Sequence, residues 1–428
     1  MSARRFRKAW LGAGLLALAM LAAAWVAWIN QAGEAPLGPD AAPDTPAQVE
    51  RGAYLARVGN CMACHTTVGG AAYAGGRGIE TPFGVVFSSN LTAHPEHGVG
   101  RWTRDAFWRA MHHGRSRDGR LLYPAFPYTE YTRITREDSD ALLAYLRTVP
   151  AADTPQRAHA LRFPYNTQAA LAVWRALYFR PAEHTPDPAQ SADWNRGAYL
   201  VQGLGHCAAC HAPRNALGAT QAAERLGGGL IPVQNWYAPA LNREDEGGLQ
   251  HWTEADVVAL LRTGVAPGAS VIGPMAEVVF RSTQYLSDED VRAMAVYLQA
   301  LPPEGEARPK PAAPPAAVMA RGAKVYEAQC AQCHGSDGRG EPGAFPALAG
   351  NRAVLLHDPT NVVRVLLLGG YPPATAGHPR PHGMPPFQQV LGDEDIAAVT
   401  SFVRNSWGNQ APGVGTMEIY RARERRGL

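Results

Sequence analysis

The chain has 428 residues, of which 18% are charged and 46% hydrophobic, and its formal net charge is +3. This length allows about three domains. Such a small net charge excludes the strongly basic surface by which nucleic-acid-binding proteins hold phosphates, so no nucleic-acid partner is expected.

The N-terminus has the pattern of an export signal. Residues 9–29 form an uncharged, mostly apolar run, which follows the basic residues Arg4, Arg5, Arg7 and Lys8. About 20 apolar residues suffice for a helix to cross a bilayer, whereas the core of a cleaved signal has roughly 7 to 15. We expect residues 1–30 to be an uncleaved anchor, with a removed signal peptide as the alternative. The remainder would then lie on the periplasmic side of the cytoplasmic membrane. Prolines in residues 31–46 predict a tether.

Three Cys-x-x-Cys-His motifs use every cysteine of the chain. They consist of Cys61, Cys64 and His65, of Cys207, Cys210 and His211, and of Cys330, Cys333 and His334. Two thiols on one turn can add to the two vinyl groups of a haem, and the adjacent histidine can then ligate the iron. A redox dithiol would need a βαβ context, a four-cysteine zinc site would leave one pair unused, and a disulfide scaffold is typical of short chains. The spacing therefore predicts three covalently bound c-type haems.

An internal repeat divides the chain into three modules. A similar segment, expected to be helical, opens each module before its motif, at residues 51–55, 196–200 and 321–326. Each module closes on a helix with acidic residues in its first turn, at residues 136–146, 287–298 and 392–403. Between them we expect a middle helix in each module. Thr103 and Thr253 would cap helices ending near His113 and Thr263, and the third would span residues 361–370. The fold class is therefore predicted to be all-α.

The repeat sets the expected domain boundaries. The modules span residues 47–150, 195–300 and 319–408, and residues 301–318 form a proline-rich linker. The connecting segment 151–194 contains an apolar helical stretch at 169–179. It would dock on a partner subunit or on the membrane surface, or simply pack between modules one and two. The tail 409–428 is expected to be a solvated end, with anionic lipid or a partner as the alternative contact for Arg421, Arg423, Arg425 and Arg426.

Two modules offer a methionine as the sixth iron ligand. Met275 and Met384 are each flanked by proline, in an expected loop between the middle and closing helices. Methionine opposite histidine is common in electron-transfer haems, where it raises the reduction potential. Met294 and Met319 are better explained by packing.

The first module departs from this pattern. Phe126 stands where the ligand methionine is expected, so the candidates are Met111, His112 and His113 at the end of the middle helix. Met111 aligns with Leu261 and Leu367, which indicates that its side chain faces the haem as ligand or as packing. An open, five-coordinate iron is the remaining alternative.

The chain resembles the triheme cytochrome c subunit of bacterial membrane-bound dehydrogenases. The resemblance covers nearly all of the chain after the anchor, and it is carried by residues 81–84 with 89–92, by 196–200 ahead of 205–207, and by 273–278. It implies three tandem class I-like cytochrome c domains. The dehydrogenases concerned are quinoprotein alcohol dehydrogenase, flavoprotein gluconate and fructose dehydrogenases, and molybdenum aldehyde or N-heterocycle oxidoreductases. Phe126 looks more like the molybdenum-linked branch, because the alcohol dehydrogenase members carry methionine there.

The resemblance also implies partners and a role. Such a subunit takes electrons from a catalytic dehydrogenase subunit, in some cases with a small additional subunit, and passes them to ubiquinone or onward to a terminal oxidase. It would have no substrate chemistry of its own. The competing hypothesis is catalysis or small-gas binding at an open first haem, with His112 or His113 as an acid–base group. A free-standing periplasmic shuttle is disfavoured by the anchor.

Overall fold

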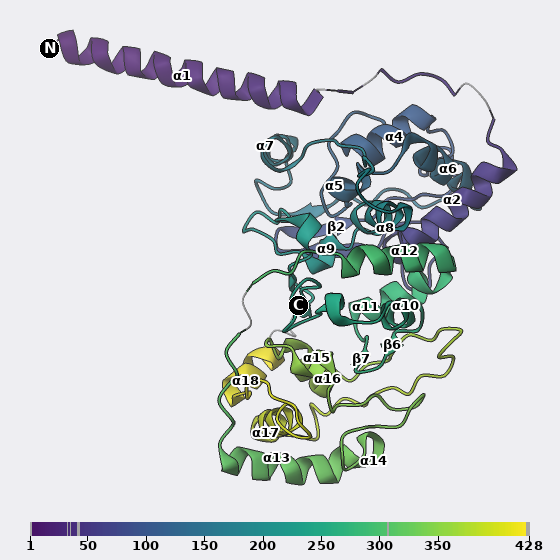
Figure 1. Cartoon of the computed structure of the whole chain (residues 1–428). Coiled ribbons are helices and arrows are strands. Elements are labelled where there is room, and N and C mark those ends of the chain that lie inside the picture. Colours follow the sequence, from purple (N-terminus) through teal and green to yellow (C-terminus); the bar gives the residue numbers. More distant parts are fainter. Residues whose placement is uncertain (1, 32, 35, 41–42, 306–307, 425–428) are drawn as a thin grey trace. The chain divides into compact units, whose positions relative to one another are not determined.

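The structure is a computed structural model that describes residues 2–31, 33–34, 36–40, 43–305 and 308–424 (Figure 1). It is mostly helical, as expected, and the residues that it describes also form three small sheets, which the sequence analysis did not predict. The strands have only two to four residues. Strands this short are missed because an alternating apolar pattern needs at least about four residues to be read.

The described residues group into two compact units. The first comprises residues up to 52, 67–79 and 83–183, and the second comprises 53–66, 80–82 and 184 onward. The division falls within α2 (Pro46–Val58) and β1 (Gly78–Thr81). The first unit contains α1 (Ser2–Gln31), β2 (Gly84–Phe87), α4 (Arg104–His113), α5 (Tyr128–Tyr131), α6 (Arg136–Leu146), β3 (Ala160–Leu161) and α7 (Gln168–Tyr178). Antiparallel pairing of β2 with β3 places Gly84 opposite Leu161.

The second unit contains the remaining helices and strands. Its elements in chain order are α3 (Cys61–His65), α8 (Ala192–Gln202), α9 (Ala208–His211), η1 (Ala223–Arg225), β4 (Gly229–Ile231), β5 (Trp236–Ala238), η2 (Leu249–His251), α10 (Glu254–Thr263), β6 (Val265–Ala266), β7 (Ala269–Ser270), α11 (Pro274–Arg281), η3 (Thr283–Tyr285), α12 (Asp288–Gln299), α13 (Ala316–Gln329), α14 (Ala331–His334), α15 (Arg352–Leu355), α16 (Thr360–Leu368), α17 (Asp393–Val403) and α18 (Thr416–Glu424). The middle helices end at His113 and Thr263 as predicted. Their caps are confirmed, since Thr103 accepts a hydrogen bond from the Ala106 N–H and Thr253 from the Asp256 N–H.

An opening helix crosses a closing helix in the same way three times. At each crossing a glycine of the opening helix lies against a backbone carbonyl and an aromatic side chain of the closing helix, so that a Cβ would collide with both. The contacts are Gly52 with Ala141 and Tyr145, Gly197 with Ala293 and Tyr297, and Gly322 with Ala398 and Phe402. Figure 1 shows the last two helix pairs, α8 with α12 and α13 with α17. The crossing explains why glycine recurs in the middle of these helices, where it otherwise lowers stability.

An ion pair accompanies each crossing. The arginine before the glycine contacts an aspartate in the first turn of the closing helix: Arg196 Nε lies 2.7 Å from Asp290 Oδ1, Arg321 Nε lies 2.8 Å from Asp395 Oδ1, and Arg51 pairs with Asp138. Asp138 and Asp290 are buried, so these carboxylates need a cationic partner. The acidic first turn inferred from the sequence therefore also has a long-range partner.

Replacing Gly197 by valine is expected to destabilise the second module. A helix interior gains about 1 kcal/mol when glycine is replaced by a better helix former. Here the added carbons meet the Ala293 carbonyl and Tyr297 Cβ, and overpacking of this kind costs about 1–3 kcal/mol. Thermal melting of the haem-loaded protein should show a lower transition temperature. Gly392→Ser is the matched control, because a Cβ at Gly392 has nothing within 4 Å and serine is a good N-cap for α17. Equal melting of the Gly197→Val variant and the parent would contradict the tight crossing.

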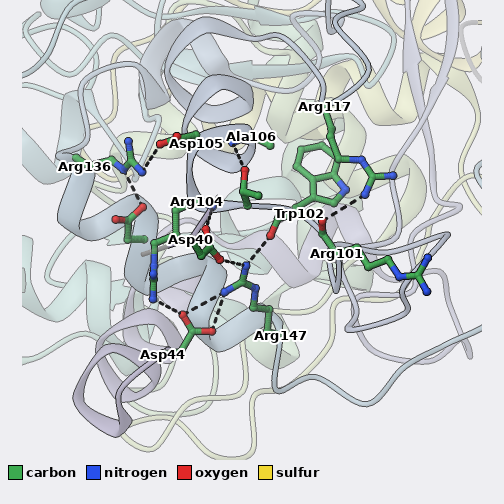
Figure 2. Close-up of polar contacts among 12 residues, drawn as sticks. Asp40, Asp44, Arg101, Trp102, Arg104, Asp105, Ala106, Arg117, Arg136 and Arg147 are labelled. Carbon is green, nitrogen blue, oxygen red and sulfur yellow. Dashed lines mark hydrogen bonds and ion pairs between the residues drawn. The ribbon is translucent and has the colours of Figure 1, made fainter. Parts of the chain in front are cut away.

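The predicted tether is held against the first module. Arg104 Nη2 lies 2.7 Å from Asp44 Oδ1, and Arg147 contacts Asp44 at 3.0 Å and Asp40 at 2.5 Å. Figure 2 shows Arg147 lying between Asp40, Asp44 and the Trp102 carbonyl, to which it donates. These ion pairs hold Asp40 and Asp44 against the first module. Nothing in the sequence indicates them, because proline-rich composition does not reveal which distant arginines two isolated aspartates will meet.

A further contact, between the Gly38 N–H and Asp105 Oδ2 at 2.8 Å, makes this docking pH-dependent. This hydrogen bond and that from Arg136 hold the pKa of Asp105 below its ordinary value. A carboxylate whose pKa is lowered on folding stabilises the fold above its unfolded pKa of about 4, and this contribution is lost as pH falls through the lower value.

Asp105→Asn is therefore expected to loosen the docked segment at neutral pH. A hydrogen bond to a charged group contributes about 1.5–3 kcal/mol, and partial exposure of Asp105 reduces this to roughly 1 kcal/mol. Hydrogen–deuterium exchange of the peptide containing Gly38 should be faster by about fivefold. Asp118→Asn removes a surface pair with Arg120 instead, and it should leave that peptide unchanged. The variant and the parent should converge only when the pH falls below the lowered pKa of Asp105. A difference that persists at still lower pH, where Asp105 is protonated, would contradict the ionic origin.

The described part of the C-terminal tail, residues 409–424, packs on the third module. Ile419 of α18 is fully buried in its core, and Val414 lies in the same cluster. Arg423 pairs with Asp393 at 2.6 Å and donates to the carbonyls of Gln388 and Leu391. The prediction of a solvated end was thus wrong for Arg423. Arg421 is exposed, whereas Arg425 and Arg426 lie outside the described residues.

Candidate functional site

Each Cys-x-x-Cys-His motif forms a single helical turn. The turns are α3, α9 and α14, which follow α2, α8 and α13. In the first two, a residue with positive φ precedes the first cysteine, Asn60 at 49° and His206 at 39°, and separates the opening helix from the turn. The third opening helix runs directly into Cys330. A helical turn places residues three apart on one face, so both thiols of each motif can reach one haem edge. All six cysteines are described, and none forms a disulfide.

The thiols have properties unlike those of a redox dithiol. Burial raises the pKa of Cys61 and of Cys207 to about 12, and that of Cys330 to about 11. Reactive Cys-x-x-Cys pairs instead have a thiolate stabilised well below pH 8.5. Cys64 and Cys333 are exposed, so each of these motifs presents one accessible and one covered sulfur.

Two motif histidines are oriented by a proline carbonyl. His211 Nδ1 donates to the carbonyl of Pro239 at 2.8 Å, and His334 Nδ1 to that of Pro346 at 3.0 Å. This arrangement leaves Nε2 with its lone pair available to a metal, as is usual for metal-binding histidines. Burial lowers the pKa of both histidines, which favours the neutral, ligating form. The residues present therefore fit haem c, and His65 takes the same position at the end of α3.

The two prolines were missed in the sequence. Pro239 lies in the segment after β5, and Pro346 follows the third motif in an irregular loop. Their carbonyls are backbone groups, so residue type alone carries no signal of the hydrogen bond. The first two modules have similar residues at 90–92 and 240–242. This similarity is the nearest sequence indication that the loop after Pro239 is structurally constrained.

The two candidate methionine ligands differ in their backbone setting. Met275 does not lie in a loop as predicted: Pro274 starts α11 and Met275 is in its first turn. Proline favours the first position of a helix, which is why the flanking proline misled the loop assignment. Met384 lies in irregular chain and pairs with Gly370 in an isolated bridge, with hydrogen bonds of 2.8 and 3.0 Å. Both side chains are half-buried, and Met384 packs against the core of the third module.

The first module replaces the methionine segment by an aromatic cluster. Phe126 packs against Tyr131, with ring centroids 5.3 Å apart, and it lies 6.4 Å from Tyr128. Met111 is buried near the end of α4, and its aligned residues Leu261 and Leu367 are buried too. All three positions are therefore buried in their modules, and whether the Met111 side chain faces a haem stays a prediction.

The two histidines beside Met111 have structural contacts of their own. His112 stacks on Trp108 at 4.4 Å and lies 3.3 Å from Thr132 Oγ1. The backbone carbonyl of His113 accepts a hydrogen bond from Arg175, and burial with neighbouring cations lowers the pKa of the His113 side chain to about 4. Burial also lowers the pKa of the His112 side chain, so both imidazoles are neutral at pH 7.

Within the second unit, the first motif contacts the second module. Ser282 Oγ donates to the Val58 carbonyl at 3.1 Å, and Arg281 of α11 reaches Met62 Sδ at 3.9 Å. Burial raises the pKa of the Cys210 thiol, and Cys64 adds to this rise. Helix α11, which carries the candidate ligand Met275 in its first turn, therefore ends on the first motif.

The candidate ligand segments of modules two and three also touch. A Cβ at Gly370 would lie 2.7 Å from Cδ1 of Ile272, which precedes Met275 by three residues. Gly370 in turn is the bridge partner of Met384. A second contact joins the same two modules: Asn361 exchanges two hydrogen bonds with the backbone of Tyr237, at 2.9 and 2.7 Å. The two ligand segments are thus packed against each other.

Comparisons with known proteins agree with haem c attachment at these motifs. The cytochrome c family model matches residues 49–150 and 319–407, which lie in the first and third modules. The cytochrome c subunit of the quinone-type alcohol dehydrogenase from Gluconacetobacter polyoxogenes is 39% identical over 386 residues, which are 86% of this chain and 82% of that protein. The cytochrome c subunit of gluconate 2-dehydrogenase from Pantoea cypripedii is 36% identical, over 86% of this chain and 88% of that protein.

A larger protein shares the same region. A nicotinate dehydrogenase subunit from Pseudomonas putida is 42% identical over 374 residues, but this chain spans only 31% of its length. The resemblance inferred from the motifs is confirmed by these relatives. The chain belongs to the family of cytochrome c subunits of bacterial dehydrogenases.

Proposed function

We propose that the chain carries electrons from the catalytic subunit of a dehydrogenase to the respiratory chain, through three covalently bound haem c groups. When bound, haem c supplies a one-electron redox centre. The observation that carries the proposal is the threefold repetition of a unit: a Cys-x-x-Cys-His turn beside a glycine-mediated helix crossing. This repetition supports three tandem cytochrome c domains, including the middle one.

The roles of the residues follow from their positions. The six motif cysteines would hold the haems covalently, with His65, His211 and His334 as proximal ligands. The carbonyls of Pro239 and Pro346 orient two of these histidines. Met275 and Met384 would occupy the sixth positions in modules two and three, and Met111 the sixth position in module one. A filled sixth position excludes substrate from the iron, which favours electron transfer over catalysis.

The contacts within the second unit support a path from module one through module two to module three. Arg281 and Met62 join α11 to the first motif, and Ile272 and Gly370 join the segments of Met275 and Met384. These contacts would hold the haem of module two next to the haem of module one and next to that of module three. Electrons could then pass from one haem to the next.

The partner is proposed from the names of the relatives. Alcohol, gluconate, fructose and nicotinate dehydrogenases all have a matching subunit or region. We expect a catalytic subunit of the quinoprotein, flavoprotein or molybdenum type, and ubiquinone or a terminal oxidase as acceptor. Helix α1, with an apolar span at Trp10–Gln31, would anchor the chain in the cytoplasmic membrane with its modules in the periplasm.

Reductive titration of the purified complex tests this function. Addition of the dehydrogenase's substrate should reduce the haems of this chain, and complete reduction should take three electrons per chain. Failure of the substrate to reduce any haem would contradict the role. A total of two electrons would contradict the number of centres but not the role.

Haem-based catalysis at the first module is the second candidate, motivated by Phe126 in the ligand segment. Carbon monoxide added to the reduced protein distinguishes the two. We expect no spectral change, because the buried thioether of Met111 is assigned to the sixth site. Binding of one carbon monoxide per chain would instead favour an open first haem.

A further inference from the structure

Helix α7 buries its charged residue and exposes apolar ones, which is the opposite of a helix on a water-exposed surface. Its one charged residue, Arg175, is only 4% exposed, whereas Val173, Leu177 and Tyr178 are 48%, 54% and 39% exposed. Arg175 Nε donates to Asn30 Oδ1 at 2.8 Å, and its Nη1 donates to the His113 carbonyl. Residues 173 and 177 are four apart, so they form one stripe with their neighbours. The face that α7 turns away from the protein is thus apolar.

The C-terminal end of α1 is fixed to this helix. Asn30 is only 6% exposed, and its side-chain amide donates to the Ala172 carbonyl at 2.9 Å while its oxygen accepts from Arg175. Arg115 donates to the Asn30 carbonyl at 2.6 Å and pairs with Glu34 at 2.7 Å. By contrast, the side chains of Trp25 and Trp28, in the last turns of the apolar span, are exposed. The polar contacts of Asn30 and Glu34 thus lie where the apolar span ends.

The hydrogen bonds between Asn30 and α7 constrain where α7 can lie relative to the membrane. If α1 crosses the bilayer, Asn30 marks the level at which it leaves the membrane. A helix is about 10–12 Å wide, so a helix in contact with that level lies within one helix width of the lipid surface. The residues around α7 match the composition of a membrane interface: Phe163 is 81% exposed, Tyr178 is partly exposed, and Arg162 and Arg180 are exposed at either side. Aromatic and basic residues are enriched at this depth.

We propose that α7 is an interfacial membrane helix, with Val173, Leu177 and Tyr178 inserted into the outer leaflet of the membrane that α1 crosses. The proposal rests on the retained anchor of the proposed function. Because Arg175 also holds the C-terminal end of α4, the helix that carries Met111 would be set next to the lipid surface. The lipid bilayer thereby becomes the surface that covers the apolar face.

Site-specific quenching tests the proposal on the full-length, haem-loaded chain. All six native cysteines are consumed by haem attachment, so Leu177→Cys introduces a single thiol for a bimane label. The labelled protein is reconstituted into phosphatidylethanolamine–phosphatidylglycerol vesicles. We expect brominated acyl chains to quench the label and aqueous iodide to quench it several-fold less than in the control. Val390→Cys is the matched control, because Val390 is 63% exposed in the third module. Val173→Cys serves as a second position if the first variant fails to fold.

Two outcomes would overturn the proposal. Equal iodide quenching at positions 177 and 390 without quenching by brominated lipid would place α7 in water. Shielding from iodide that needs the catalytic subunit and occurs without lipid quenching would make α7 a subunit interface. The intact mass of the same sample separates the failures: loss of residues 1–30 contradicts the retained anchor, whereas a full-length chain with a water-exposed label contradicts only the role of α7.

Discussion

A chain in which Cys330 and Cys333 are both replaced by alanine will carry two covalently bound haems instead of three. Cys330 and Cys333 are the only cysteines of the third module. Every other cysteine of the chain belongs to the first or the second motif. No other thiol is therefore left to hold the third haem covalently. Intact mass under denaturing conditions and the pyridine haemochrome absorbance should both fall by one haem per chain.

The matched control for this experiment is Gln332→Ala. Gln332 is exposed between the two cysteines and contributes no thiol, so three haems should remain. Three covalent haems in the double cysteine variant would show that the third motif does not hold one. The corresponding Cys207 and Cys210 variant examines the middle module, which the family match does not include.

Replacing Met384 by alanine will lower the reduction potential of one haem and open its iron. A thioether opposite histidine stabilises the reduced iron, and the choice of axial ligands sets haem potentials over about 0.8 V. We therefore expect the midpoint potential of one centre to fall by on the order of 100 mV, while the other two stay in place. The spectroelectrochemical titration should show this, and carbon monoxide should bind one reduced haem per chain.

Met417→Ala controls for loss of a methionine without loss of a ligand. Met417 is 58% exposed on α18, so its replacement should leave all three potentials unchanged. An unchanged titration of the Met384→Ala variant would contradict the assignment of Met384. Met275→Ala should behave like Met384→Ala but affect a different centre, and Met111→Ala distinguishes a ligand from core packing in module one.

Local patterns predicted much of the helical framework. Thr103 and Thr253 mark the starts of α4 and α10 because a hydroxyl before an apolar repeat caps the free N–H groups of a first turn. The starts of α6, α12 and α17 could likewise be predicted from the acidic residues in their first turns. The motif histidines needed only their spacing from the cysteines, because haem attachment is set within one turn.

The candidate ligand segments were harder to interpret. Proline beside Met275 predicts a loop, yet Pro274 begins α11, because proline is favoured both in loops and at the first position of a helix. The small sheets were missed because their strands are too short for an alternating pattern. In these segments the same residues are compatible with several local structures. Tertiary contacts with the rest of the chain determine which one forms.

The sequence by itself determined the number of Cys-x-x-Cys-His turns, the helices around them and the apolar N-terminal span, since each depends on residues close together in the chain. Only the tertiary structure decided which residues far apart meet. Arg404 is fully buried and donates to the carbonyls of Val354, Leu356 and Pro412, and Arg175 turns inward so that the apolar face of α7 points out. An arginine reads as a surface residue in any local pattern. Its burial becomes favourable only where distant carbonyls and side chains converge to satisfy its five N–H donors.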